Sequence, residues 1–353
     1  MDEAAYNGPR QVPTLLQEDL LYCVFDHIAH PHALALAASV CRAWTIPAQA
    51  ALYREIEYSP LTSHRRERLL ARTMRTRPHL LRLVRRLYLI TIWTHSPTPE
   101  LCDWITRIPP DRLIEFRWTW ERGHPLPSLL DSPAVRATRS IELRGRLYTL
   151  ESVRSILELP FLESLSLELK GDEQGHLTNV TPSKLRHLHL VAQGGYSRAV
   201  ETLLSTVGPQ LQSFRLACNL GENSERDGRL ASCVATHCPN LGRFEIEAIA
   251  SPQAPVPFAD ALVRRCGSLE CLRCGGGTYT SAIFRGIPPS LRVLALAIAP
   301  TLEAPLLEYL KTDTPGRGRL ARLELVGDED EERDRRIEDA CSSRGVVLRF
   351  SSR

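Results

Sequence analysis

The clearest feature of the chain is a short apolar pattern that returns throughout the sequence beyond residue 80. Each copy has an apolar residue followed by two more, three and five positions later, which suits a strand that buries one side. About ten copies are present: Val84-Leu87-Leu89, Leu113-Phe116-Trp118, Thr138-Ile141-Leu143, Leu162-Leu165-Leu167, Leu185-Leu188-Leu190, Leu211-Phe214-Leu216, Leu241-Phe244-Ile246, Leu269-Leu272-Cys274, Leu291-Leu294-Leu296 and Leu320-Leu323-Leu325. They follow one another at intervals of about 22 to 30 residues. The pattern predicts a series of short, stacked strands.

The segments between these strands have helical patterns. One apolar stripe consists of Ala259, Leu262, Val263 and Cys266, and another of Ala199, Leu203, Leu204 and Val207. Turn-forming residues such as Gly208-Pro209 stand just before the next strand. One strand and one helix at this spacing resemble a leucine-rich repeat. The fold class expected is therefore α/β, with a curved parallel sheet on the concave side, helices on the convex side and a capping strand at 346–350.

The N-terminal segment has a different, purely helical pattern. Apolar residues recur at three- and four-residue spacing from Leu15 to Ile28, and again from Leu34 to Trp44, with a break at 30–32 between them. A third short pattern covers residues 48–56, and Pro47 is expected to lie beyond the second helix. These segments predict a three-helix unit with little core of its own, whose leftover apolar surface would suit a permanent partner.

Two stretches of this unit resemble the F-box family. Residues 16–25, Leu-Gln-Glu-Asp-Leu-Leu-Tyr-Cys-Val-Phe, are similar to the F-box opening, and Val40-Cys41-Arg42-Ala43-Trp44 is similar to its second signature. Residues 52–56 resemble the segment that leads into repeats in fungal members, whereas Gln17 replaces the usual proline. The resemblance implies docking to the Skp-type adaptor of a cullin ligase. Seven residues are implied either to contact the adaptor or to form the core of the module: Leu16, Leu20, Leu21, Val24, Phe25, Val40 and Trp44.

The expected organisation has three parts: an F-box module at 12–57, a basic amphipathic linker helix at 58–80 and the repeat array at 81–353. The linker region, extended to residue 86, is dense in arginine and also carries leucines. Phosphate binding by these arginines is one interpretation. A helix that docks its leucines while its arginines face water explains the same residues, and we favour it.

Side chains between the apolar positions of each strand should point away from the core, onto the concave face. The residues predicted to bind a protein substrate there are Tyr88, Arg117, Arg144, His187, His189, Arg215, Arg243, Glu245 and Arg273. The same face should also carry Glu115, Glu142, Glu168, Glu247, Arg322 and Glu324. The alternation of positive and negative side chains favours a protein partner, because a protein surface that binds nucleic acid is nearly all positive.

Composition narrows the functional classes further. The 44 basic and 41 acidic residues leave a net charge of +3, little for a dedicated nucleic-acid binder. The acidic, polar start lacks the features of a secretion signal, and the apolar runs are too short to cross a bilayer. Ten cysteines are too sparse for a disulfide scaffold. We expect a protein of the cytoplasm, the nucleus or both, with no membrane or nucleic-acid partner.

No motif predicts catalysis, a metal site or a cofactor. Cys271 and Cys274 have the spacing of half a zinc site, but they flank the centre of a strand and should face opposite sides. His187 and His189 share a face without a third ligand nearby in sequence. The favoured function is the substrate-recognition subunit of an SCF-type (Skp–cullin–F-box) ubiquitin ligase. The alternative is a leucine-rich-repeat scaffold that binds a protein without any ligase, with the helical module capping the array.

Overall fold

The structure, a computed structural model, falls into two compact units. The first comprises residues 1–119 and 127–138, and the second comprises 120–126 and 139–353. The structure describes residues 14–58, 64–91, 99–120, 128–145, 150–169, 177, 180, 184–193, 197–221, 223–249, 255–297, 299–312, 320–327 and 330–351. The predicted three-part division at residues 57 and 80 stays a prediction.

Three helices open the first unit: α1 (Thr14–Asp26), α2 (Pro31–Val40) and α3 (Arg42–Arg54). Pro31 occupies the first turn of α2, where its missing N–H breaks no helical hydrogen bond and its fixed φ suits the helix. The helices share one small core, made of Phe25, Leu34, Ala37 and Ala48. The predicted three-helix arrangement is therefore present, and its core is as small as the sequence implied.

The boundary between the second and third helices was predicted wrongly. Instead of continuing to Trp44, α2 ends at Val40, Cys41 is extended (φ −156°, ψ 166°), and α3 begins at Arg42 and includes Pro47. The Thr45 hydroxyl donates to the carbonyls of Ala38 and Cys41, each at 3.0 Å, and so ties the two helices together. Apolar spacing continues through this corner because both helices pack on the same core, so periodicity alone does not reveal it.

A strand that the sequence analysis did not identify follows directly. Strand β1 (Glu55–Tyr58) pairs in parallel with β2 (Arg86–Thr91), with Ile56 opposite Leu87. Tyr53, Ile56 and Tyr58 have the repeat's spacing, but tyrosine stands at both outer positions. Paired strands are therefore present before residue 80, and α4 (His64–Thr76) is the helix that follows the first of them. The other elements of this unit are η1 (Pro78–Arg82), α5 (Pro99–Thr106), β3 (Glu115–Trp120), η2 (Ser128–Asp131) and α6 (Pro133–Arg136).

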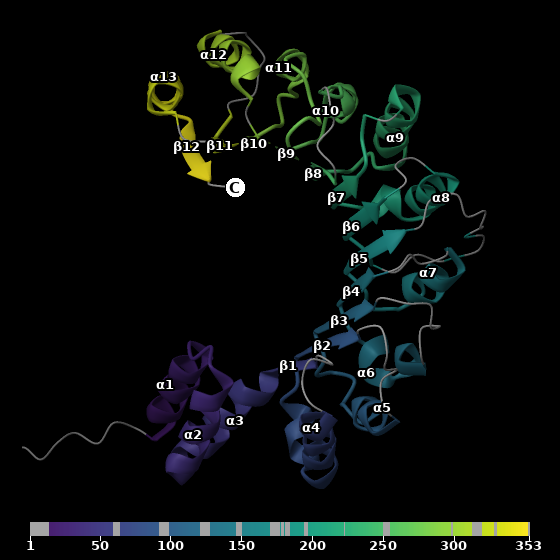
Figure 1. Cartoon of the computed structure of the whole chain (residues 1–353), viewed down its shortest axis with the longest axis vertical. Helices are drawn as coiled ribbons and strands as arrows, with labels where there is room; N and C mark the ends of the chain where they lie inside the picture. The colour runs from purple at the N-terminus through teal and green to yellow at the C-terminus, as the bar shows by residue number, and fades with distance from the viewer. Residues whose placement is uncertain are drawn as a thin grey trace, which may run out of the picture. The chain divides into compact units, whose positions relative to one another are not determined.

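The second unit alternates strands with helices (Figure 1). Its strands are β4 (Ser140–Gly145), β5 (Ser164–Leu169), β6 (His187–Ala192), β7 (Ser213–Cys218), β8 (Arg243–Ala248), β9 (Cys271–Cys274), β10 (Val293–Ala297), β11 (Arg322–Val326) and β12 (Val347–Ser351). Its helices are α7 (Leu150–Leu157), α8 (Arg198–Val207), η3 (Gly208–Gln210), α9 (Ser224–His237), α10 (Phe258–Val263), α11 (Ile283–Gly286), η4 (Pro300–Leu302), α12 (Glu303–Lys311) and α13 (Glu331–Ser342).

Each strand of this unit pairs in parallel with the next one along the chain, from β4 to β12. Within the unit the strands line the inner side of a curved stack and the helices its outer side (Figure 1). The predicted α/β fold, a leucine-rich-repeat solenoid, is confirmed; within the described residues a helix separates each strand of this unit from the next, except between β5 and β6. Strand β12 forms the predicted final strand, preceded by α13, whose first turn is capped by the Asp330 side chain.

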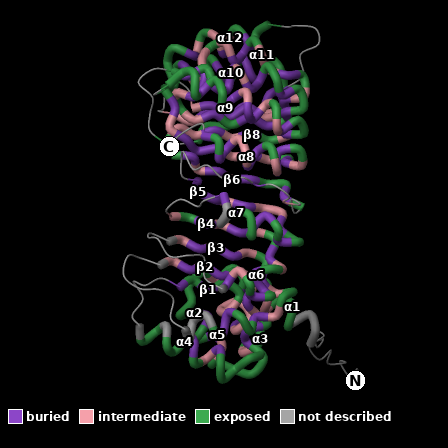
Figure 2. The backbone as a smooth tube through the Cα atoms, turned by 90° about the vertical axis from the view of Figure 1, so that its right-hand side faces the viewer, coloured by how far each residue is buried: buried purple, intermediate pink, exposed green. Residues whose placement is uncertain are grey.

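The core of the second unit is a set of columns that run from strand to strand. Parallel pairing sets Leu188 opposite Phe214, and Phe214 opposite Phe244, whose rings lie 5.7 Å apart. These side chains are completely or almost completely buried, and the burial continues along the strands in Figure 2. In the first unit, Thr138, the one polar member of the repeated pattern, is also buried, and its hydroxyl donates to the Ala134 carbonyl at 2.9 Å. No repeat buries its apolar side without the next one.

Two glycines test how closely neighbouring repeats approach. A Cβ at Gly208 would lie 2.4 Å from the carbonyl oxygen of His237, whereas one at Gly228 in α9 would meet nothing within 4 Å. We expect Gly208→Ala to lower the free energy of unfolding by about 1–3 kcal/mol through overpacking. Gly228→Ala should raise it by about 0.5–1 kcal/mol, since alanine favours a helix. Urea unfolding followed by circular dichroism measures both, and an equal effect of the two would contradict this packing.

Candidate functional site

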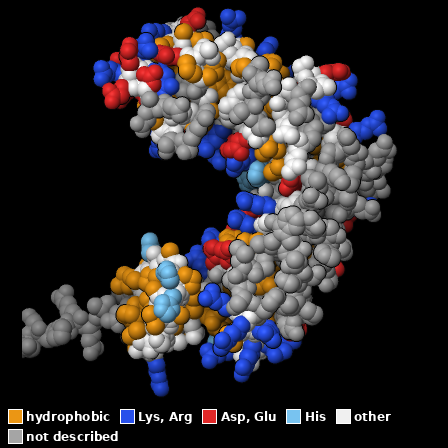
Figure 3. Space-filling model, viewed as in Figure 1, with side chains coloured by type: hydrophobic (Ala, Val, Ile, Leu, Met, Phe, Trp, Pro, Cys, Tyr) orange, Lys and Arg blue, Asp and Glu red, His pale blue; other side chains and the backbone are white. Residues whose placement is uncertain are grey.

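The helical module leaves a large part of its apolar surface uncovered. Six hydrophobic side chains on its helices are 37% to 63% exposed, and we call them the apolar face: Leu20, Val24, Leu36, Val40, Trp44 and Ile46. Hydrophobic side chains gather visibly over this module in Figure 3. Leu20 and Val24, like Leu36 and Val40, stand four residues apart and so lie on one side of their helices. Several large exposed apolar residues on so small a unit indicate a protein-binding surface.

The structure separates the F-box-like residues into two groups that periodicity left mixed. Leu20, Val24, Val40 and Trp44 are exposed, whereas Phe25 is buried and Leu21 packs partly buried against the same core. The Trp44 ring meets the Phe25 ring edge-on at 5.6 Å between centroids, so it joins the apolar face to the core. Leu16 belongs to α1, but its side chain lies outside the described residues.

Two members of the apolar face, Leu36 and Ile46, were not singled out by the sequence analysis. Leu36 precedes Val40 by one helical turn, which was a usable signal. No sequence signal pointed to Ile46, because the third helix was expected to begin only at residue 48. In the structure α3 begins at Arg42 and so includes Ile46.

Polar residues on the inner face of the second unit stand in a row set by strand register. Each residue of this central row is the pairing partner of the next: Glu142, Ser166, His189, Arg215, Glu245, Arg273, Ala295, Glu324 and Arg349. Opposite charges thus meet on neighbouring strands, an arrangement that stabilises a sheet. The predicted residues His189, Arg215, Glu245 and Arg273 are brought together in it.

Ion pairs connect much of this row. Arg215 lies 3.6 Å from Glu245 and 2.9 Å from Glu247. Arg273 on β9 reaches Glu324 on β11 at 2.9 Å, passing over the small Ala295 of β10, which is buried. Arg322 adds a second contact to Glu324 at 3.5 Å. The charges of this row are therefore largely compensated within the protein. A partner would have few unpaired charges to neutralise there.

Two titratable side chains of the inner face, His189 and Glu168, are hydrogen-bonded, and burial shifts their pKa values. His189 Nδ1 lies 3.0 Å from Ser166 Oγ, and burial, reinforced by the nearby Arg215, lowers the pKa of His189. The ring is therefore kept neutral at neutral pH. Burial likewise raises the pKa of Glu168, which accepts a hydrogen bond from the Gln193 side-chain amide.

The remaining predicted residues occupy different surroundings. Arg243 on β8 has no ion pair within the described parts of the chain, and His187 is exposed at the start of β6. Arg144 pairs with Glu142 on its own strand. Tyr88 and Arg117 belong to the first unit, where the Arg117 guanidinium lies 4.6 Å from the centre of the Tyr88 ring. Burial is the main cause that raises the pKa of Tyr88.

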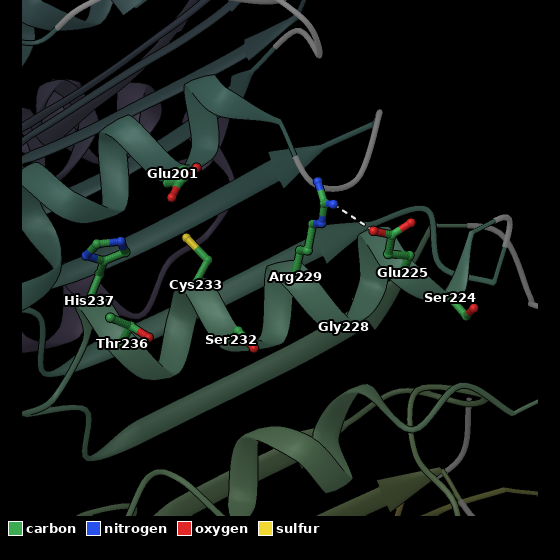
Figure 4. A pocket seen from close by; sticks show the side chains of 9 residues that line it. All are labelled: Glu201, Ser224, Glu225, Gly228, Arg229, Ser232, Cys233, Thr236 and His237. Atoms are coloured by element: carbon green, nitrogen blue, oxygen red, sulfur yellow. Dashed lines mark hydrogen bonds and ion pairs between the residues drawn. The ribbon is translucent and has the colours of Figure 1, made fainter.

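No group of three or more metal-ligating side chains occurs within the described ranges, and none of the helices described there is long and apolar enough to cross a membrane. A groove on the outer side, over α8 and α9, includes Glu201, Cys233 and His237 (Figure 4). Burial raises the pKa of Cys233 to about 12, so its thiol is a poor nucleophile at neutral pH.

Comparisons with known proteins give no family assignment. The sequence matches no protein-family model and no curated protein. Among solved structures, the leucine-rich repeat-containing protein LegL7 from Legionella pneumophila is similar over 85% of this chain and 90% of its own, at 15% identity and a TM-score of 0.48. The yeast Rad7 and Elc1 complex is similar over 88% of this chain and 69% of the other, at 16% identity and a TM-score of 0.39. Similarity this low carries no functional argument.

The ion pair across Ala295 should contribute measurably to stability. Glu324→Gln removes a carboxylate that is only 13% exposed and contacts two arginines, so we expect a loss of about 1–2 kcal/mol. Glu225→Gln breaks a pair whose side chains are 63% and 74% exposed, and should cost less than about 0.5 kcal/mol. Urea unfolding at low salt measures the difference. Equal costs would show that the row does not hold the strands together.

Proposed function

We propose that this protein is the substrate-recognition subunit of an SCF-type ubiquitin ligase. In this role the helical module docks a Skp-type adaptor, and the inner face of the repeats holds a protein substrate. The observation that carries the proposal is the apolar face: Leu20, Val24, Val40 and Trp44 occupy F-box-like positions and are all exposed. These residues are where the resemblance implies adaptor contacts.

The energetics of the module support a permanent partner. Its core contains four fully buried hydrophobic residues, fewer than the six exposed on the apolar face. Covering one large apolar side chain is worth about 1.5–3 kcal/mol when burial is complete. A partner that covers several of them would therefore stabilise the module as well as bind it.

The repeats supply the second half of the proposal. Their inner face offers arginine, glutamate and histidine on adjacent strands, and its internal ion pairs leave a surface of mixed sign. Such a surface suits a folded protein with complementary charge better than a polyanion. The proposed mechanism is proximity, since the ligase needs its substrate held in place, and we propose no catalytic role for this chain.

One observation favours the alternative, a repeat protein without a ligase. The third helix leads directly into β1, and Arg54 at its end accepts a backbone hydrogen bond from Arg85 at 2.8 Å while pairing with Asp26 of α1 at 2.6 Å. The module is thus joined to the first repeat, as a cap would be. Adaptor binding separates the two functions.

Leu20→Asp combined with Val24→Asp should abolish co-purification with a Skp-type adaptor, because both carboxylates would be buried without partners. The matched control is Phe161→Asp with Ile249→Asp, since these side chains are 52% and 48% exposed in the second unit, against 57% and 55%. The control should bind like the wild type. Circular dichroism verifies that both variants fold. A wild-type chain that does not bind the adaptor would overturn the proposal.

The substrate half is tested in cells. Proximity labelling with the proteasome inhibited should mark the same neighbours for the wild type and for the Leu20→Asp, Val24→Asp variant, because the repeats are unchanged. Those neighbours should carry ubiquitin only with the wild type. Neighbours that are equally ubiquitylated with both variants would contradict a ligase role and favour the scaffold.

A further inference from the structure

Helix α4 has an arginine stripe that pairs with no carboxylate among the described side chains. Arg65, Arg68, Arg72 and Arg75 follow at three- and four-residue steps, which places them on one side of the helix. The stripe is about 15 Å long at the rise of an α-helix. All four side chains are exposed, while Met74 on the opposite side is buried. Lysine and arginine side chains gather there in Figure 3.

Three other helices carry an exposed arginine with an acidic partner, whereas the exposed Arg198 on α8 and Arg335 on α13 have none among the described side chains. On α5, α7 and α9 an arginine has an acidic partner four residues away: Arg107 with Asp103, Arg154 with Glu158 and Arg229 with Glu225. The four stripe residues make no ion pair within the parts of the chain that are described. The stripe is therefore a distinct feature, not the usual composition of these helices.

This arrangement opposes the stability of α4 itself. Like charges three and four residues apart repel one another along a helix. Arg65 also stands in the first turn, where the helix dipole favours acidic residues. A bound polyanionic group would relieve both effects, so the stripe suits a ligand that brings several negative charges in line.

One apolar residue identifies the kind of ligand. Leu69 lies between Arg68 and Arg72 on the outer side and is 51% exposed. The phosphates that would pair with the arginines of the stripe offer no apolar group for it, and the net charge of +3 provides little long-range attraction for a duplex. We propose that α4 binds an acidic segment of a partner protein, with carboxylates spaced along the stripe and an apolar side chain over Leu69. This inference is independent of adaptor docking.

The test uses the full chain and a labelled peptide of about 15 residues in which glutamate recurs every third or fourth position around a central leucine. Arg68→Glu with Arg72→Glu should weaken binding at least about tenfold in fluorescence anisotropy at physiological salt. The matched control is Arg198→Glu with Arg335→Glu, which reverses two exposed arginines on α8 and α13. It should change the affinity less than about twofold, since most of the attraction is local.

Four further measurements discriminate other occupants. Leu69→Ser should weaken binding of the leucine peptide about threefold and leave an all-glutamate peptide unaffected. The Leu20→Asp, Val24→Asp variant should bind the peptide normally, whatever happens to the adaptor. An RNA or DNA oligonucleotide of equal charge that binds α4 more tightly than the peptide, or self-association of the chain that depends on Arg68 and Arg72, would overturn the inference. Loss of binding in the Arg198, Arg335 control would also overturn it.

Discussion

The structure depends on one constraint: a strand of this protein has a buried side that only the next strand can cover. Parallel pairing without a shift sets Leu188 beside Phe214, and Phe214 beside Phe244, so each column of the core continues through successive repeats. Helices such as α8 then cover the outer side of the strands, with residues such as Leu203 completely buried. Stability is therefore close to a sum of neighbour contacts.

The same register organises the inner face. Side chains between the core positions also meet their counterparts, so Arg215 lies opposite Glu245 and Arg273 reaches Glu324 over the small Ala295. Most charge is consequently balanced within the protein. Arg243 has no ion pair in the described chain, so a partner's carboxylate would add a new interaction there. The arginine stripe of α4 differs from the inner face, because strand register places no opposite charge beside its arginines.

The sequence predicted the repeats well because their pattern reports which side of a strand is buried. It missed β1 because tyrosine occupies two of the three pattern positions there, and it placed the corner at Cys41 inside a helix because apolar spacing continues across it. It did not separate Val24 from Phe25, since spacing gives the side of a helix but not the depth of burial. The ion pairs depend on strand register across intervening helices, which no local pattern encodes.

The central claim is that the apolar face of the helical module docks a Skp-type adaptor. Hydrogen exchange of the full chain, with and without the purified adaptor, tests it most directly. The account predicts slower exchange in the α1 and α2 amides, which carry Leu20, Val24, Leu36 and Val40, and no change in α8 of the second unit. Unchanged exchange in α1 and α2 at saturating adaptor would contradict it.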